Sequence, residues 1–311
     1  MTDPVAIGID IGGSGIKGLL INPGTGAVLA SHRLETPVAE GPDAVTATVA
    51  ATARRLTELA GSTASGPPPV GVVVPGIVDE PCGVVRSAVN LGFLDLPLAA
   101  NLSAAIGRPV RLGHDVRAGG LAEARFGAGK GERNVLFVPL GTGIAAGCVV
   151  DGRLLSAGGY AGELGHVVVV PDGEQCPCGQ RGCLERYASA AAVARRYTAR
   201  TGSPVSGSAE VIARVGAGDP AALAVLDEAV QALVTALLAA ITLLGSAVVV
   251  IGGGLARAGA ALMDPLAIEL ETRMTFHRRP RLAIAELGDE AGAIGAALLA
   301  ADAAAWAGGA A

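Results

Sequence analysis

The sequence predicts an α/β protein with two lobes, and three observations support this. At 311 residues the chain is long enough for two domains with a core each. Short runs of β-branched residues alternate with longer segments of helical spacing, which is typical of sheets packed against helices. The pattern of strand, glycine turn and strand occurs at the N-terminus and again near residue 140, which suggests two similar halves facing one another across a cleft.

The composition excludes several classes of protein. Hydrophobic residues make up 51% of the chain but aromatic residues only 3%, so the cores must be built from Ala, Val, Leu and Ile. The net charge is −5 with no basic block, which argues against nucleic-acid binding because that needs a concentrated positive face. The N-terminus lacks the basic region of a signal peptide, and Asp10 interrupts the first apolar run, so we expect a cytoplasmic protein.

One apolar run is long enough to cross a membrane. Residues 229–251 contain no charged side chain. Gly245 and Ser246 divide the run into a helix-like half and a short β-branched half, and a buried helix followed by a buried parallel strand gives the same pattern. We therefore expect core structure here and no membrane.

The first half begins with three short strands joined by glycine turns, which predicts an antiparallel meander over residues 5–11, 16–21 and 27–36. The first turn carries a set of residues suited to phosphate and Mg²⁺: Asp10, Gly12, Gly13, Ser14 and Lys17. Backbone N–H groups exposed by glycines can hold phosphate oxygens, and a carboxylate at a strand end can hold Mg²⁺ through water. A glycine hairpin with a capping aspartate fits the same residues, so this turn alone identifies no function.

A helix is predicted over residues 44–59 from its apolar spacing, and buried strands are predicted over 70–74 and 110–112. The second of these strands runs into His114 and Asp115, where a further helical segment begins. An aspartate at this junction lies at the carboxyl edge of a sheet, where α/β folds bind their ligands. The alternative role for Asp115 is that of a helix N-cap.

The second half repeats the arrangement with a strand over residues 134–140. It ends in Gly141, Thr142 and Gly143, whose amides and hydroxyl make a second candidate phosphate site. A strand over 248–251 ends in three further glycines, which let a flat ring or a phosphate approach the backbone. The remaining predicted elements are a return strand, three helices, a last strand and a terminal helix: residues 148–150, 188–201, 209–217, 220–244, 282–286 and 290–305.

A metal site is indicated by three cysteines within eight residues and a histidine ten residues upstream: Cys176, Cys178, Cys183 and His166. A Cys₃His set fills the tetrahedral shell of Zn²⁺ and leaves no position for water, which predicts a structural zinc. Three buried cysteines with a core histidine, or a disulfide that leaves one thiol unpaired, are the alternatives. Glu163 and Glu185 bracket this stretch, so a metal that fixes it also fixes two carboxylates.

Seven motifs in colinear order from Ile7 to Gly295 resemble the ROK family of bacterial sugar kinases: DIGGSxxKG, VPGIVD, HDxxxxxLAE, GTGIAAG, GExGH, CxCGxxGCxE and IGGGL. Members of that family are similar to hexokinases and actin in their two-lobed, ATP-binding, ribonuclease H-like fold. The resemblance implies a small N-terminal lobe over residues 1–114 and a large lobe with the zinc site over 115–294. A C-terminal helix over 295–311 would return to the small lobe.

The resemblance further implies ATP-dependent phosphorylation of a hexose 6-hydroxyl, with glucose as the first candidate and Mg²⁺ and a structural Zn²⁺ as cofactors. Asp115 matches the catalytic base. The sugar-binding positions are Gly76, Asn90, His114, Asp115, Glu163, His166 and Glu185. The nucleotide-binding positions are Asp10, Gly12, Gly13, Ser14, Lys17, Gly141, Thr142, Gly143, Gly253 and Gly254. The zinc ligands are His166, Cys176, Cys178 and Cys183.

One departure from the family leaves the sugar open. The family usually has Asn directly before the catalytic Asp, where this sequence has His114, and one imidazole nitrogen cannot both donate and accept as an amide does. A kinase of N-acetylglucosamine or N-acetylmannosamine is therefore an alternative, and the choice between ATP and polyphosphate as donor is also open. We expect a sugar and ATP as small-molecule partners, and a homodimer or homotetramer.

Two alternatives come from other classes. A non-catalytic sugar-binding regulator would keep the fold, but Asp115 is retained and no DNA-binding segment precedes Ile7. An enzyme similar to acetate kinases would share the broad fold, but such an enzyme needs neither a zinc knuckle nor paired carboxylates to hold its acyl substrate.

Overall fold

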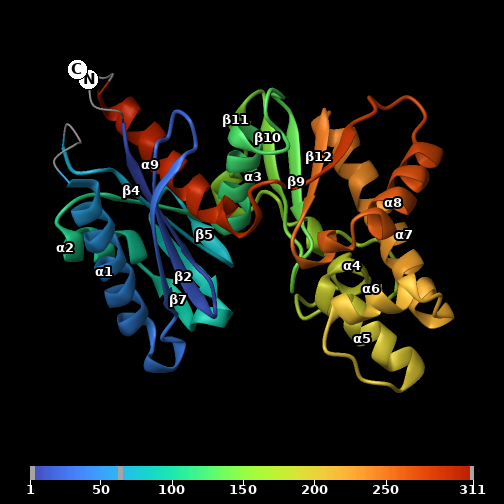
Figure 1. Cartoon of the computed structure of the whole chain (residues 1–311). Helices are drawn as coiled ribbons and strands as arrows, with labels where there is room; N and C mark the ends of the chain where they lie inside the picture. Colours follow the sequence, from blue (N-terminus) through green and yellow to red (C-terminus); the bar gives the residue numbers. More distant parts are fainter. Residues whose placement is uncertain (1–3, 62–65, 309–311) are drawn as a thin grey trace. The chain divides into compact units, whose positions relative to one another are not determined.

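The computed structural model describes residues 4–61 and 66–308, and the chain forms two compact units (Figure 1). The first unit contains the chain up to Phe126, the segment Leu154–Ala161 and the chain from Asp289 onward. The second unit contains Gly127–Arg153 and Gly162–Gly288. The division into functional lobes at residues 115 and 295 stays a prediction.

The first unit is built on a five-stranded sheet with the strand order β3-β2-β1-β4-β8. The strands are β1 (Ala6–Ile11), β2 (Gly15–Ile21), β3 (Val28–Glu35), β4 (Val70–Val74) and β8 (Val110–His114). The first three form the predicted antiparallel meander, whereas β4 is parallel to β1 and β8 is parallel to β4. Strands buried on both faces read as continuous apolar runs, as in the VGVVV of β4.

Helices cover both faces of this sheet: α1 (Pro42–Ala60), α2 (Leu98–Ile106), α3 (Asp115–Phe126) and α9 (Ala291–Gly308). The alanine-rich α9 lies directly on β1 and β4, and a Cβ added at Gly71 would overlap the carbonyl oxygen of Ala296. On the other face, Thr52 and Leu56 of α1 lie against Gly18 of β2. Small residues at these contacts bring the helix and strand backbones close together.

A second, three-stranded antiparallel sheet completes the first unit and consists of β5 (Ile77–Asp79), β6 (Val84–Ala88) and β7 (Phe93–Leu96). Short 3₁₀ turns η1 (Val38–Glu40) and η3 (Val89–Leu91) connect elements of this unit. The turn η4 (Ala157–Gly159), in the inserted segment of the unit, lies against β5.

The second unit has a five-stranded sheet with the order β11-β10-β9-β12-β13. Its strands are β9 (Val135–Pro139), β10 (Gly147–Val150), β11 (Arg153–Leu154), β12 (Val248–Gly252) and β13 (Arg281–Ile284). Strand β12 runs parallel to both β9 and β13, and β10 runs antiparallel to β9. Both sheets therefore combine an antiparallel edge with parallel central strands, and the antiparallel pairs correspond to the repeated pattern of strand, glycine turn and strand.

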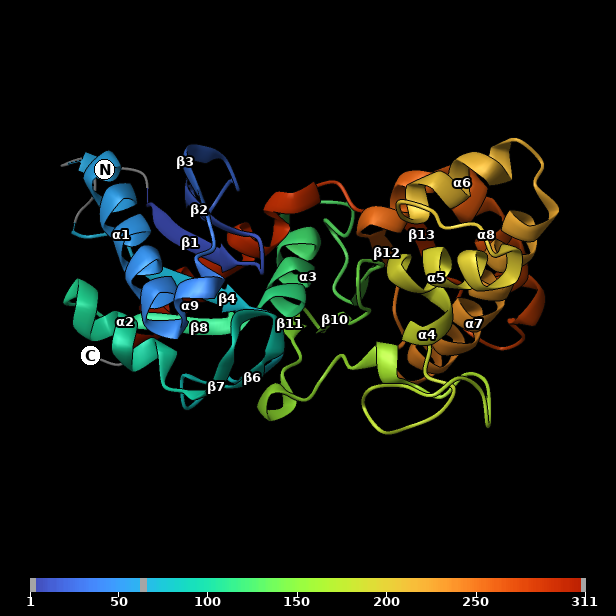
Figure 2. The ribbon, with the colours of Figure 1, turned by 90° about the horizontal axis from the view of Figure 1, so that it is seen from below.

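The helices of the second unit gather beside β12 and β13 (Figure 2). They are α4 (Glu185–Ala188), α5 (Ala190–Thr201), α6 (Ser208–Gly216), α7 (Pro220–Leu244) and α8 (Ala260–Arg273). The 3₁₀ turns are η5 (Leu164–His166), η6 (Gly254–Ala258) and η7 (Gly288–Glu290), the last of which leads into the first unit.

The apolar run over residues 229–251 forms the second part of helix α7 and most of strand β12, as predicted. Within residues 4–61 and 66–308, α7 is the one helix that is long and apolar enough to cross a membrane. It begins with Pro220 after the N-cap Asp219, whose carboxylate accepts two backbone N–H groups, and it ends at Gly245 in a left-handed conformation. Of its apolar window, 61% is buried in the second unit, where Leu233 and Leu237 belong to the core. This burial is the arrangement expected of a core helix.

Candidate active site and metal centre

The glycine turn between β1 and β2 lies at the carboxyl end of β1. Its shape is fixed by the Gly12 N–H, which donates to the Gly15 carbonyl at 2.9 Å, and by the Thr36 hydroxyl, which donates to the Gly12 carbonyl at 2.6 Å. Gly13 and Ser14 form the tip of this turn, and Gly13 faces Asn90. The structure thus brings a predicted sugar-binding residue next to the predicted phosphate turn.

Asp10 and Lys17 are direct partners across β1 and β2, so their side chains share one face of the sheet. Burial, followed by the charge of Asp115, raises the pKa of Asp10 to about 7, and the charge of Lys17 partly opposes this shift. A carboxyl group held at such a pKa by burial and by a second carboxylate is typical of sites that accept a cation.

Lys17 is itself engaged in an ion pair. Its Nζ lies 2.9 Å from Oδ2 of Asp289, which also pairs with Arg33 at 2.8 Å. Hydrogen bonds from Arg33 and then from Lys17 lower the pKa of Asp289 to about 2. The Lys17 ammonium is therefore held in place beside the glycine turn by a permanently ionised partner.

Asp115 is the first residue of α3 and directly follows β8, as the sequence predicts. Its Oδ1 accepts the N–H of Val116 at 2.7 Å and lies 3.2 Å from Nδ1 of His114. The Asp115 side chain is 29% exposed and His114 is buried, so the carboxylate is accessible while its neighbour is enclosed. Asp115 thus holds a backbone N–H at the start of the helix and remains accessible, while its role at a ligand site stays a prediction.

A buried ion pair beneath Asp115 was not predicted. The Arg117 side chain is 1% exposed, and its guanidinium contacts Glu80 through Nε at 3.0 Å and Nη2 at 2.9 Å. Its Nη1 donates to the carbonyls of Gly159 and Ala161, and Glu80 also accepts the His114 N–H at 3.3 Å. The pair therefore ties the β8–α3 junction to two other segments of the first unit. An arginine within an alanine- and glycine-rich buried helix is the sequence signal that could have revealed it.

Gly76 follows β4 with a φ of +95°, and its Cα lies close to the Ser87 carbonyl, where a Cβ would not fit. Only glycine adopts this conformation without strain, so Gly76 shapes the start of the three-stranded sheet.

In the second unit, the pairing of β9 with β12 brings two glycine turns together. The Leu140 N–H donates to the Gly252 carbonyl at 2.9 Å, and the Leu255 N–H donates to the Leu140 carbonyl at 3.1 Å. The turn over residues 141–143 and the glycines Gly253 and Gly254 thus adjoin one another at the carboxyl edge of the sheet. Thr142 is exposed and Gly254 has open space above its Cα, so ligand atoms can approach both.

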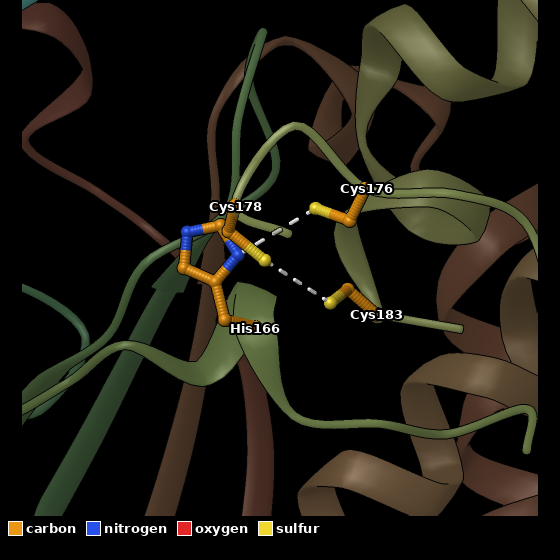
Figure 3. A group of neighbouring side chains, drawn as sticks. All are labelled: His166, Cys176, Cys178 and Cys183. Carbon is orange, nitrogen blue, oxygen red and sulfur yellow. Dashed lines mark hydrogen bonds between the residues drawn. The ribbon is translucent and has the colours of Figure 1, made fainter. Parts of the chain in front are cut away.

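The four predicted metal ligands converge at one point in the second unit (Figure 3). All ligand atoms of His166, Cys176, Cys178 and Cys183 lie within 4.8 Å of one another. The Cys178 and Cys183 sulfurs are 3.7 Å apart, and Cys176 Sγ is 3.9 Å from His166 Nδ1. Tetrahedral zinc with Zn–S bonds of about 2.3 Å separates two sulfurs by about 3.8 Å, so the four side chains fit this ion.

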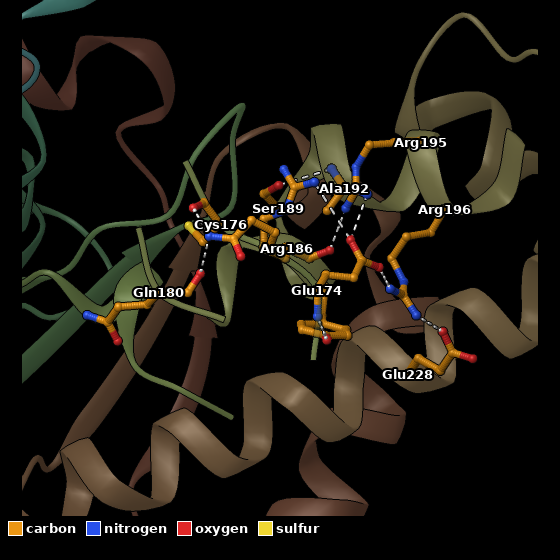
Figure 4. Close-up of polar contacts among 11 residues, drawn as sticks. Glu174, Cys176, Gln180, Arg186, Ser189, Ala192, Arg195, Arg196 and Glu228 are labelled. Carbon is orange, nitrogen blue, oxygen red and sulfur yellow. Dashed lines mark hydrogen bonds and ion pairs between the residues drawn. The ribbon is translucent and has the colours of Figure 1, made fainter. Parts of the chain in front are cut away.

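The stretch that carries these ligands is fixed to the helices behind it (Figure 4). Glu174 forms ion pairs with Arg186 of α4 and with Arg195 and Arg196 of α5, and Arg196 also pairs with Glu228 of α7. The Arg195 guanidinium additionally donates to the Arg186 carbonyl at 2.8 Å. This network holds α4, which begins with Glu185, in a fixed place relative to the cysteines.

The two bracketing carboxylates differ in their surroundings. Glu163 is exposed at the start of η5, where its carbonyl accepts the N–H of His166 at 3.0 Å. Glu185 is partly buried, and its Oε2 accepts the N–H of Ile144 at 2.9 Å. The second unit therefore holds both carboxylates, the metal centre and two glycine turns, while the first unit holds Asp10, Asn90 and Asp115.

Comparison with known proteins finds similar proteins over nearly the whole chain. A model described as the ROK family matches residues 6–303. A glucokinase from Thermotoga maritima is 35% identical over 308 residues, covering 94% of this chain and 95% of the relative. A ROK hexokinase structure from Thermus thermophilus has a TM-score of 0.86 at 34% identity, covering 97% of this chain and 99% of that one. A ROK family glucokinase from Streptomyces griseus, solved with glucose and AMPPNP, has a TM-score of 0.78 at 28% identity, covering 96% and 99%. The predicted fold class is confirmed.

Proposed function

Because this chain belongs to the ROK family, we propose that it is an ATP-dependent kinase that phosphorylates the 6-hydroxyl of a hexose, with glucose as its sugar. The observation that carries this proposal is the pair of neighbouring carboxyl groups Asp10 and Asp115 in the first unit. One is held at a pKa of about 7 beside a glycine turn, and the other is accessible at a strand–helix junction. A kinase needs a cation and phosphate site next to a base for the acceptor hydroxyl.

Asp115 acts as the general base and accepts the proton of the sugar hydroxyl as its oxygen attacks the γ-phosphate. Its carboxylate is oriented by the Val116 N–H and by His114, whose Nδ1 lies 3.2 Å away. Asp10, Lys17 and the turn from Gly12 to Ser14 hold the phosphates from the first unit. Mg²⁺ bound with ATP would neutralise the phosphate charge, and Asp10 is the residue that would hold it through water.

The sugar hydroxyls are contacted by Asn90, Glu163, Glu185 and His166. The support for His166 is the direction of its ring, because Nδ1 faces Cys176 and leaves Nε2 for a hydroxyl. A structural Zn²⁺ held by His166 and the three cysteines would fix the residues on either side of it. The turn over residues 141–143 and the glycines Gly253 and Gly254 serve the nucleotide from the second unit.

The test is ADP release with MgATP against glucose, mannose, fructose, N-acetylglucosamine and N-acetylmannosamine, repeated with polyphosphate as donor. We expect glucose and ATP to give the highest kcat/KM. Higher turnover with an N-acetylated sugar would identify that sugar, and not glucose, as the substrate. Protein that binds AMPPNP but releases no ADP with any sugar would contradict the kinase assignment and favour a regulator.

The general-base role is tested by Asp115→Asn. Loss of general-base catalysis lowers rates by about 10²–10⁴, so kcat is expected to fall by at least 100-fold while AMPPNP affinity is kept. A variant that keeps more than about a tenth of the wild-type kcat would exclude Asp115 as the base.

A further inference from the structure

We propose that Glu185 has a second role beyond the sugar: its carboxylate sets the shape of the phosphate turn Gly141–Ile144 and thereby couples sugar binding to nucleotide binding. This inference rests on the proposed function, which assigns Glu185 to the sugar and the turn to the nucleotide. Every contact that supports it lies within the second unit.

The first support is the direct contact between the carboxylate and the turn. Oε2 of Glu185 accepts the N–H of Ile144 at 2.9 Å, although the two residues are 41 positions apart. A Cβ added at Gly143 would lie 2.6 Å from the same oxygen, so a side chain there would force the carboxylate away from the turn. Because Gly143 has no side chain, the carboxylate can reach the turn. The glycine therefore leaves space for Glu185 as well as for a phosphate.

The second support is that other residues flanking the metal centre also hold this turn. The N–H of Ala190 donates to the Gly141 carbonyl at 2.8 Å. In the segment before the cysteines, Gly165 lies so close to the Ile144 carbonyl that a Cβ there would overlap it. The turn is thus enclosed by the residues before and after the cysteines, and Glu185 supplies the charged contact among them.

The third support is that hydrogen bonds hold the backbone on both sides of Glu185 in place. The Leu184 N–H donates to the Val167 carbonyl at 2.9 Å, and Val168 forms a β-bridge with Cys183. Arg195 holds the carbonyl of Arg186 on the other side, as Figure 4 shows. The side chain is therefore the adjustable part, with Oε2 on the turn and Oε1 available to a sugar hydroxyl.

The coupling follows from this division of the two oxygens. A sugar hydroxyl on Oε1 orders the carboxylate and so favours the arrangement in which Oε2 holds the Ile144 N–H. A nucleotide that binds the ordered turn favours the same carboxylate position. By linkage, each ligand then raises the affinity for the other by the same factor.

The experiment measures the Kd of Mg-AMPPNP by titration calorimetry without sugar, and again at saturating glucose, for wild type, Glu185→Ala, Glu185→Gln and Glu163→Ala. Glu163→Ala is the matched control, because Glu163 shares the sugar role but has no hydrogen bond to the turn in the described chain. We expect Glu185→Ala to weaken AMPPNP binding without sugar by about tenfold or more, the effect of losing a charge-assisted hydrogen bond. Glu185→Gln should weaken it less, because the amide oxygen still accepts the Ile144 N–H.

Glu163→Ala should weaken glucose binding and leave the sugar-free Kd of AMPPNP unchanged. An unchanged Kd in Glu185→Ala, with glucose binding lost, would overturn the inference and leave the proposed function intact. Wild-type protein that binds AMPPNP but no sugar would instead overturn the proposed function. If Glu185→Ala does not fold by its melting curve, the comparison of Glu185→Leu with Glu163→Leu decides, because leucine removes the acceptor and keeps most of the volume; equal sugar-free Kd values would overturn the inference.

Discussion

Replacing Glu80 with alanine should destabilise the protein far more than the removal of an ordinary surface carboxylate. Arg117 would keep its charge in a position that is 1% exposed, without the partner that now lies 2.9 Å from its guanidinium. At an effective dielectric constant of about 20, unit charges at this distance attract by about 6 kcal/mol before desolvation is subtracted. Breaking a buried pair lowers stability by about 3–5 kcal/mol, and the remaining carbonyl contacts of Arg117 place the expected loss near 3 kcal/mol.

The free energy of unfolding is measured by urea denaturation of the ligand-free protein, together with kcat. Glu58→Ala is the matched control, because Glu58 pairs with Arg55 on the surface of α1 and such pairs contribute about 0–1 kcal/mol. The double variant Glu80→Ala/Arg117→Met should recover at least half of the loss, since no unpaired charge remains buried. We also expect kcat to fall in Glu80→Ala, because Glu80 holds the backbone of His114 next to the base.

A loss in Glu80→Ala no larger than that in Glu58→Ala would refute this reasoning. A double variant that is less stable than Glu80→Ala would also refute it, because the penalty would then come from lost packing and not from an uncompensated charge.

Three further outcomes are expected. In Mg²⁺-free protein the pKa of Asp10 is raised from 3.8 to about 7, so the folded state binds the proton more tightly than the unfolded state and wild type loses stability as pH rises from about 4 to 7. The melting temperature of Asp10→Asn relative to wild type should therefore increase over that range and level off above it. A difference in melting temperature that does not depend on pH would contradict the shift. Elemental analysis should give one zinc per chain in wild type and none in Cys183→Ser, and the variant should have a lower melting temperature. Wild-type protein that is as stable without zinc as with it would exclude a structural metal. Gly71→Ala should lower the stability of the protein by about 1–3 kcal/mol or prevent folding, because the added methyl group overlaps the Ala296 carbonyl. Gly216→Ala is the control: residue 216 faces open space on α6, so the substitution should leave the melting temperature unchanged or raise it.

Much of the local structure could be predicted because its signals lie within short stretches of chain. The meander that begins the first unit follows from alternating strands and glycine turns, and the metal ligands follow from the spacing of three cysteines. The predicted helix over residues 188–201 is α5 and begins two residues later than predicted, because Ser189 adopts an extended conformation that separates it from α4 and caps α5 by accepting the Ala192 N–H. A serine between alanines could have indicated this break.

Other parts depend on contacts between distant residues and could not be predicted. The strands β5 and β7 have three and four residues, which is too short for a clear alternation, and α8 carries Pro265 within a helix. The proximity of Asn90 to the glycine turn depends on that small sheet. The ion pair between Glu80 and Arg117 joins residues 37 positions apart, and no periodicity brings them together.

The order in which the two units can form follows from how the chain is divided between them. The second unit is almost continuous from Gly127 to Gly288, whereas the first needs α9, which follows the whole second unit in the chain. Until α9 leaves the ribosome, the β1 and β4 face of the first sheet lacks the helix that covers it. The first unit is therefore expected to be completed after the second, and a nascent or truncated chain that stops before residue 291 presents an open apolar sheet to chaperones and proteases.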